Sequence, residues 1–312
     1  MYAKRILALI LSLTALTAGG QTRFVFSPQW TAQAQFAGYY AAYELGFYKQ
    51  AGLDVEIRHP FATKQALDII LSGQAQATTL PLTEAIRLVN QGKSLVNILQ
   101  TSMNSSLMLI SRFGVDPATM KKGKVLTWRA GHDLIARCMA KRTGLDYEWI
   151  EAATPRNLFI AGAADATIAM SYNEYFQLLQ TGLVPPGNTI YRFSEHDYNV
   201  QEDGVWMLAT DYAKQKDAAE RFAEASRKGW EWVADHPEEA LDIVMEYVRK
   251  HKIHSNRALQ QFMLEEILRL QLDPDSGERT FQLRPDMVRK ASDLMLESGF
   301  VKRPVTYKEL VP

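Results

Sequence analysis

Aromatic and amide side chains follow the first strand-like segment of the chain, 23–26. They are Trp30, Gln33 and Gln35. An indole face can stack on a planar ring while its N–H donates, and glutamine offers an uncharged donor and acceptor. Since open α/β sheets bind ligands at the carboxyl ends of their strands, these residues predict a site for a small, polar, flat ligand. The alternatives are an indole that only packs between lobes and amides that cap or face solvent.

Trp128 occupies the corresponding place after a strand-like segment later in the chain, and Arg129 follows it as a possible anchor for an anion. Glu174 comes after the strand-like segment 165–170. Its carboxylate could accept from an exocyclic amine, or instead match the positive end of a helix. The remaining ligand-binding candidates lie on an aromatic helix face, at a helix start or near chain crossings: Tyr39, Pro81, Asn104, Ser105, Asp197 and Tyr198, the last two as hinge or ligand residues.

Residues that could support catalysis or bind a metal are sparse. The six histidines show no His-Glu-x-x-His spacing, and neither Gly-x-Ser-x-Gly nor a glycine-rich phosphate loop occurs. The single cysteine, Cys138, excludes a disulfide framework and any site built on several thiolates, and its helical surroundings predict core packing. We therefore expect no catalytic residues, no metal and no cofactor.

The charge balance and hydrophobic content of the chain indicate which kinds of partner it can have. The chain has 35 Lys and Arg against 35 Asp and Glu, and 47% of its 312 residues are hydrophobic. This balance is that of a globular protein with a real core, and it lacks the basic stripe typical of nucleic-acid binders. We expect a monomer with a small-molecule ligand and no nucleic-acid partner.

The elements that must position these residues alternate between strand-like and helix-like patterns. The alternation runs to about residue 112 and restarts after the turn at 114–117. Long amphipathic helices follow at about 217–234, 237–250, 256–271 and 286–298. We expect two α/β lobes with doubly wound, mainly parallel sheets. Lobe one would comprise 21–112 and 205–312, and lobe two 113–204, with crossings near 111–114 and 198–204 and the ligand between the lobes.

The first 20 residues resemble a secretory signal. Lys4 and Arg5 precede an uncharged apolar run, 6–18, and small residues follow at 18–20. Thirteen apolar residues are too few for a transmembrane helix, which needs about 20. We expect cleavage near Gly20 and a soluble periplasmic protein; the alternative is a buried N-terminal helix.

Two stretches carry a family resemblance: 30–55, with its Ala-Gly-Tyr-Tyr and Gly-Phe-Tyr steps before Gly-Leu-Asp-Val, and the Leu-Ser-Gly-Gln-Ala step at 71–75. They resemble the thiamine-pyrimidine-precursor and sulfonate/nitrate-type periplasmic substrate-binding proteins, over essentially 22–250. The resemblance implies a type II periplasmic-binding-protein fold with a helical C-terminal tail. It also implies an ABC importer as partner and a ligand related to thiamine biosynthesis.

The chain departs from the family pattern at the first strand. The family commonly carries an acid before the Trp and a His at the end of the motif, where this chain has Gln29 and Phe36. The superfamily also includes thiamine pyrimidine synthase, which holds pyridoxal phosphate on a Lys followed by an active-site His. Segment 80–84 here is Leu-Pro-Leu-Thr-Glu, and no cysteine cluster occurs. The residues that the synthase chemistry requires, a Lys, a His and a cysteine cluster, are therefore missing at these positions.

The expected function is therefore an exported, non-enzymatic protein that captures a small polar, aromatic ligand for an ABC importer. Three alternatives remain open. They are a thiamine pyrimidine synthase-like enzyme, a ligand-sensing subunit for a membrane signalling kinase, and a sulfonate/nitrate-type binding protein.

Overall fold

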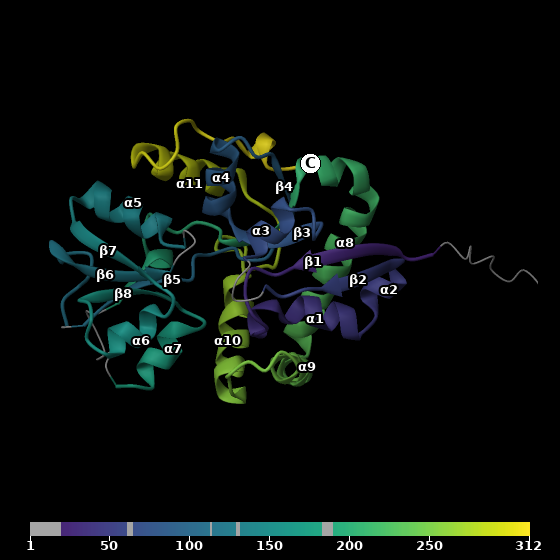
Figure 1. Cartoon of the computed structure of the whole chain (residues 1–312), viewed down its shortest axis with the longest axis horizontal. Helices are drawn as coiled ribbons and strands as arrows, with labels where there is room; N and C mark the ends of the chain where they lie inside the picture. The colour runs from purple at the N-terminus through teal and green to yellow at the C-terminus, as the bar shows by residue number, and fades with distance from the viewer. Residues whose placement is uncertain (1–19, 61–64, 113, 129–131, 183–189) are drawn as a thin grey trace, which may run out of the picture.

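Two five-stranded sheets flanked by helices form two lobes in the computed structural model, which describes residues 20–60, 65–112, 114–128, 132–182 and 190–312 (Figure 1). Sheet one has the order β2 (Leu53–Ile57), β1 (Thr22–Ser27), β3 (Ala77–Pro81), β10 (Asp203–Leu208), β4 (Leu95–Gln100). Sheet two has the order β7 (Asp146–Ala152), β6 (Lys122–Trp128), β8 (Ala166–Met170), β5 (Leu107–Ser111), β9 (Ile190–Arg192). The expected two-lobed α/β architecture is confirmed.

Both sheets are mainly parallel, as expected, and each contains one antiparallel strand. In sheet one β1 runs parallel to β2 and β3, whereas β10 is antiparallel to β3 and β4. In sheet two β6 runs parallel to β7 and β8, whereas β5 is antiparallel to β8 and β9. β5 and β10 are antiparallel because each enters its sheet from the other lobe, at the edge where the parallel strands end.

The crossings between lobes differ from the sequence-based expectation. Strand β5 pairs within sheet two, so the first crossing is 101–106 and not 111–114, and the expected boundary at residue 112 is wrong by the length of this strand. The second crossing is 193–202, because β10 begins sheet one again at Asp203. The short apolar pattern of β5 identifies a strand but not the sheet to which it belongs.

Helices cover both sheets and form the tail. The shorter helices are α1 (Ala37–Glu44), α2 (Phe47–Gln50), α3 (Ala66–Leu71), α4 (Leu82–Asn90), α5 (Leu134–Thr143), α6 (Pro155–Ile160) and α7 (Glu174–Leu179). The tail contains α8 (Ala209–Asp235), α9 (Pro237–Lys250), α10 (Arg257–Leu270) and α11 (Pro285–Glu297). This confirms the expected helical C-terminal region. No helix in the described ranges combines the length and apolar character needed to cross a membrane.

Helix α8 holds the core of lobe one through a close contact with α1. A Cβ on Gly229 would lie 2.1 Å from the carbonyl oxygen of Gly38, and a Cβ on Gly38 would lie 2.2 Å from the Trp230 ring. Only glycine allows the two helices to approach this closely. The helix pair presses Phe222 onto Phe24 of β1, with ring centroids 4.6 Å apart. Strand β1, which leads to Trp30, is therefore firmly placed.

The tail packs on both lobes and not on lobe one alone. Helix α11 lies over α4 of lobe one and α5 of lobe two, and one hydrophobic cluster includes side chains of all three helices (Figure 1). Cys138 of α5 is buried in this cluster. On the other side of the molecule, Phe262 of α10 stacks on Phe176 of α7 at 4.4 Å. The tail therefore joins the lobes at two places.

The loop between α10 and α11 contacts both crossings. Asn104 of the first crossing donates from Nδ2 to the carbonyl of Leu272 (2.8 Å). Gln201 of the second crossing donates from Nε2 to the carbonyl of Gln282 (2.9 Å), and its Oε1 accepts from the backbone N–H of Arg284 (2.8 Å). The same loop thus fixes the position of one chain crossing relative to the other.

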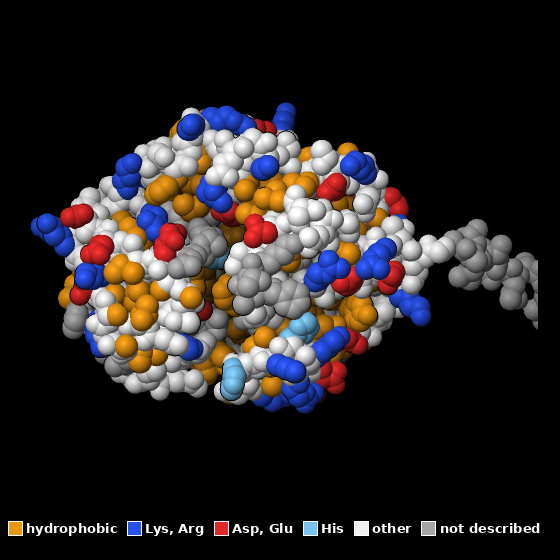
Figure 2. Space-filling view, in the orientation of Figure 1, with side chains coloured by type: hydrophobic (Ala, Val, Ile, Leu, Met, Phe, Trp, Pro, Cys, Tyr) orange, Lys and Arg blue, Asp and Glu red, His pale blue; other side chains and the backbone are white. Residues whose placement is uncertain are grey.

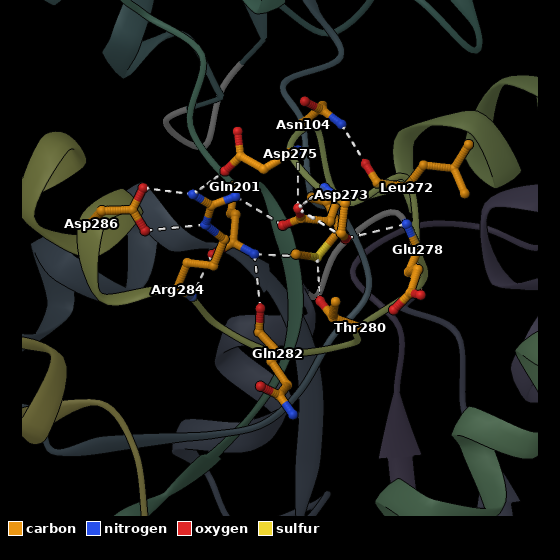
Figure 3. Close-up of polar contacts among 12 residues, drawn as sticks. Asn104, Gln201, Leu272, Asp273, Asp275, Glu278, Thr280, Gln282, Arg284 and Asp286 are labelled. Carbon is orange, nitrogen blue, oxygen red and sulfur yellow. Dashed lines mark hydrogen bonds and ion pairs between the residues drawn. The ribbon is translucent and has the colours of Figure 1, made fainter.

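Arg284 gives this loop its shape, as the close-up in Figure 3 shows. Its guanidinium lies 2.8 Å from Asp273, 2.7 Å from Asp275 and 2.9 Å from Asp286. The pKa of Asp273 lies below the usual range because the backbone N–H of Ser276, then Arg284, outweigh the effect of burial. Arg284 is the main group that lowers the pKa of Asp286. Elsewhere on the face shown in Figure 2, acidic and basic side chains are intermingled over both lobes.

Candidate ligand-binding cleft

A cavity lies where the carboxyl ends of the parallel strands of both sheets face each other. About 380 Å³ of it is free of protein atoms, including space open to solvent, within the range of small-molecule sites. Its described lining is Gln29, Trp30, Gln33, Gln35, Trp128, His132, Met170, Tyr172, Asn173 and Glu174. The lining draws on both lobes.

A second cavity adjoins the first and extends toward the crossings. It shares Gln29, His132, Met170 and Tyr172 with the first and adds Pro81, Thr83, Leu107, Ile135, Val200, Glu202 and Asp203. We call the two cavities together the cleft. Its described lining contains carboxylates, amides, aromatic rings and a histidine but no Lys or Arg.

Lobe one contributes a chain of amides to the cleft. Gln33 donates from Nε2 to Oε1 of Gln35 (2.6 Å), and Gln35 donates from Nε2 to Oδ2 of Asp203 (2.6 Å). Gln29 donates from Nε2 to the other oxygen, Oδ1 of Asp203 (2.9 Å). The sheet explains this meeting: β10 starts where β1 and β3 end, so its first residue lies beside the segment that follows β1.

Asp203 lies at the centre of the electrostatics of the cleft. Burial raises its pKa, while the donors on Gln35 and Gln29 and the nearby His132 lower it. Burial also lowers the pKa of His132, against the attraction of Asp203, Glu84 and Asp133. His132 precedes α5 of lobe two, so these two titratable groups face each other across the cleft.

Lobe two contributes Glu174, the first residue of α7. Its carboxylate accepts from the backbone N–H of Met170 (3.2 Å) and from Nδ2 of Asn173 (3.0 Å). Burial raises its pKa to about 7, although the backbone N–H groups of Glu174 and Met170 and the charge of Arg156 act in the opposite direction. Glu174 therefore changes charge near neutral pH, and a ligand can shift that equilibrium.

The two indoles of the cleft have different supports. Trp30 is 39% exposed, and its carbonyl lies 2.7 Å from Nδ1 of His59. His59 Nε2 lies 2.8 Å from the Tyr40 hydroxyl. Burial lowers the pKa of His59 to about 4, so the neutral ring donates to Trp30 and accepts from Tyr40. Trp128 ends β6, and its ring contacts His132 edge to face at 6.3 Å.

The crossings meet at Glu202. Its carboxylate accepts from the Ser105 hydroxyl (2.6 Å) and from the backbone N–H (2.9 Å) and hydroxyl (2.6 Å) of Ser106. Asn199 adds two bonds, accepting from the backbone N–H of Ser105 (2.8 Å) and donating to Oδ1 of Asn104 (3.0 Å). Burial raises the pKa of Glu202, and the serine donors oppose this. The crossings are therefore tied to each other beside the ligand cavity.

Six of the sequence-predicted site residues come together at the cleft: Trp30, Gln33, Gln35, Pro81, Trp128 and Glu174. Arg129 lies outside the described residues. Asn104 and Ser105 hold the crossings together and are absent from the cavity lining.

The structure places three predicted residues away from the cleft. Tyr39 is buried in the core of lobe one, with its ring 4.6 Å from Phe26 and 5.7 Å from Trp230. Asp197 is exposed, and Tyr198 is buried against Phe193 at 6.2 Å. Aromatic periodicity marked the face of α1 that packs on the sheet, so the prediction of a ligand contact for Tyr39 confused core with site.

Sequence reasoning missed seven residues of the lining that carry polar side-chain atoms or rings: Gln29, Thr83, His132, Tyr172, Asn173, Glu202 and Asp203. Gln29 could have been found, since it immediately precedes Trp30. Asp203 could not, because nothing in its own segment shows that β10 inserts between β3 and β4.

This arrangement can hold a flat molecule between side chains of two lobes and satisfy hydrogen-bond donors on its edges. Among the described residues no group of three or more His, Cys, Asp or Glu is placed to hold a metal ion. The described lining of the cleft also contains no lysine that could form a Schiff base and no cysteine.

The comparisons with known proteins agree with this architecture. The NMT1/THI5-like family model matches residues 33–240. A formylaminopyrimidine-binding protein from Halalkalibacterium halodurans is 23% identical over 256 residues, which cover 78% of this chain and 75% of that protein.

Solved structures share the fold at low identity. The ligand-binding component of an ABC-type import system from Staphylococcus aureus has a TM-score of 0.68 at 11% identity, covering 94% of this chain and 97% of that one. The periplasmic aliphatic sulphonate-binding protein of Escherichia coli has a TM-score of 0.63 at 13% identity, covering 94% and 92%. With a family model that spans two thirds of its length, a two-lobed fold and a cleft between the lobes, this chain belongs to the NMT1/THI5-like family.

Proposed function

We propose that this protein is an exported substrate-binding protein that captures a flat, amine-bearing ligand of the thiamine-pyrimidine-precursor type and delivers it to an ABC importer. The observation that carries the proposal is the cleft itself. It has an indole on each lobe, Asp203 and Glu174 as acceptors, and no Lys or Arg in its described lining. A neutral ring with N–H donors fits these groups, and an anion does not.

The relatives support the class of protein and differ in ligand. The relative from Halalkalibacterium halodurans is named for a formylaminopyrimidine, and the neighbour from Escherichia coli for an aliphatic sulphonate. The carboxylates of the cleft favour the pyrimidine. Arg129, the sequence-predicted anion anchor, lies outside the described residues, so a direct measurement must decide between the two ligands.

Titration calorimetry with formylaminopyrimidine and with ethanesulfonate provides that measurement. We expect binding of the pyrimidine and none of the sulfonate. Tight sulfonate binding that is lost in Arg129→Ala, with Trp30→Ala without effect, would overturn the pyrimidine proposal. It would leave the class of binding protein standing.

Two further parts of the proposal have their own tests. Export predicts that the intact mass of protein from its own host corresponds to a chain starting near Gln21; a full-length cytosolic chain would contradict it. The absence of enzymatic activity predicts no Schiff-base absorbance when pyridoxal phosphate is added to the pure protein. A Schiff-base absorbance that appears in the wild type and is lost in Trp30→Ala would place the reaction in the cleft. That result would favour the synthase-like alternative.

A further inference from the structure

The hydrogen bonds of the lobe-one amides all run in one direction, toward Asp203. Gln33 donates to Gln35, Gln35 donates to Oδ2 of Asp203, and Gln29 donates to Oδ1. An ionised carboxylate can only accept, so both amides that touch it must turn their NH₂ groups toward it. The orientation of Gln35 then leaves its Oε1 for Gln33. One charge thereby sets the direction of three amides.

The carbonyl oxygen of Gln29 is the group left over. It is buried and has no hydrogen-bond partner among the described residues. Gln29 lines both cavities of the cleft, so this acceptor borders the space that a ligand would fill. A buried acceptor without a partner is costly, and a ligand that brings an N–H group to it removes that cost.

We propose that Asp203 is a specificity-determining residue that acts through Gln29 and Gln35: by fixing the direction of these amides it makes the lobe-one wall an acceptor surface, which selects ligands that present an N–H donor. The inference rests on the proposed function and adds a residue-level account of its ligand class. It concerns the edge of the ligand nearest β10, whereas the indoles recognise the ring face.

Substitution of Asp203 by Asn makes the prediction specific. An Asn side chain offers one acceptor and one NH₂ group where the carboxylate offers two acceptors. One of the two contacting glutamines must therefore reverse, and the wall then presents a donor in place of an acceptor. Gln29→Met provides the complementary change, since it removes the free carbonyl and leaves Asp203 in place.

The experiment compares two probes in titration calorimetry: an aminopyrimidine and the same ring with hydrogen in place of the amino group. We expect the wild type to prefer the amino compound by at least about tenfold, as one buried hydrogen bond allows. Asp203→Asn and Gln29→Met should each reduce this preference to about threefold or less. Asp54→Asn, an exposed carboxylate on β2 of the same sheet, is the matched control and should keep the wild-type preference.

The outcomes separate this inference from the proposed function. Wild-type protein that binds neither ring contradicts the proposed function and this inference with it. Wild-type protein that binds both rings equally, or variants that keep the full preference, overturns only the role of Asp203. If Asp203→Asn does not fold, as judged by thermal unfolding, Gln29→Met and Gln35→Met decide the question by the same ratio.

Discussion

The two lobes repeat one strand order and differ in where they place their charges. Strands β2, β1, β3, β10 and β4 of sheet one correspond in position and direction to β7, β6, β8, β5 and β9 of sheet two. Trp30 follows β1, and Trp128 ends the equivalent strand β6. The repeat therefore supplies matching aromatic residues on the two walls.

The carboxylates break this symmetry. In lobe one Asp203 begins the antiparallel strand and pairs with Pro81, whereas the equivalent pair in lobe two, Leu107 and Met170, is uncharged. In lobe two Glu174 begins the helix after β8, whereas Leu82 begins the equivalent helix of lobe one. The shared topology sets the shape of the walls, and the unequal placement of acids distinguishes the two edges of a ligand. If the proposed flat ligand binds here, we expect it to adopt a single orientation.

The largest expected effect concerns the two indoles that occupy equivalent positions in the two lobes. Trp30→Ala and Trp128→Ala should each weaken ligand binding by about tenfold or more, since each removes an aromatic contact and its buried area. Trp232→Ala, on α8 away from the cleft lining, should leave affinity unchanged in the same titrations. Loss of affinity in only one of the two cleft variants would show that the walls are not functionally equivalent.

The acid that lobe two has and lobe one lacks, Glu174, can be tested through the pH dependence of ligand affinity. Because its pKa is raised to about 7, the fraction of carboxylate grows as pH rises from 6 to 8, and binding of an N–H donor should strengthen over that range. Glu174→Gln should weaken binding by about tenfold at pH 8 and by much less at pH 6. The ratio of wild-type to variant affinity is taken at each pH, because any effect of ligand protonation on affinity is common to both proteins and cancels. A ratio that does not change with pH would show that the ligand does not use this carboxylate.

The supports of the two indole backbones differ in length, since His59 lies 2.7 Å from the Trp30 carbonyl and the Thr127 hydroxyl lies 3.5 Å from the Trp128 carbonyl. The His59 contact predicts a smaller effect than the indoles themselves. His59→Leu removes a hydrogen bond to the Trp30 carbonyl and should weaken binding by about threefold. In a Trp30→Ala background the same change should have little further effect, because the two act together. Since the pKa of His59 is about 4, this effect should be constant between pH 6 and 8. Full additivity in the double variant would contradict a positioning role.

The smallest expected effect is on stability. A carboxyl group whose pKa is higher in the folded than in the unfolded state lowers stability progressively as pH rises from its ordinary value toward 7. Glu174→Gln removes this cost, so the empty variant should melt on the order of 2 °C above the wild type at pH 8. At pH 4.5 the two should melt together. A lower Tm for the variant at pH 8 would show that the hydrogen bonds of Glu174 outweigh its burial.

Site residues that directly follow a single strand could be predicted from the sequence. Site residues whose position depends on the pairing of a second, distant strand could not. Trp30 and Trp128 were identifiable because each follows an apolar run, and strand ends in such sheets gather at the ligand site. The sheet to which β5 belongs was not identifiable, since its four apolar residues and terminal serine fit either sheet. Asp203 was missed for the same reason: its hydrogen-bond partners Gln29 and Gln35 lie 174 and 168 residues earlier in the chain.

The insertion of β10 between β3 and β4 also has a consequence for how the chain folds. Sheet two can be completed from residues 107–192 alone, whereas β3 and the edge strand β4 of sheet one wait for a partner more than a hundred residues further along. Contacts of such long range slow folding. As the chain folds, lobe two can therefore form first, while β3 and β4 still expose unpaired edges that invite association with other chains.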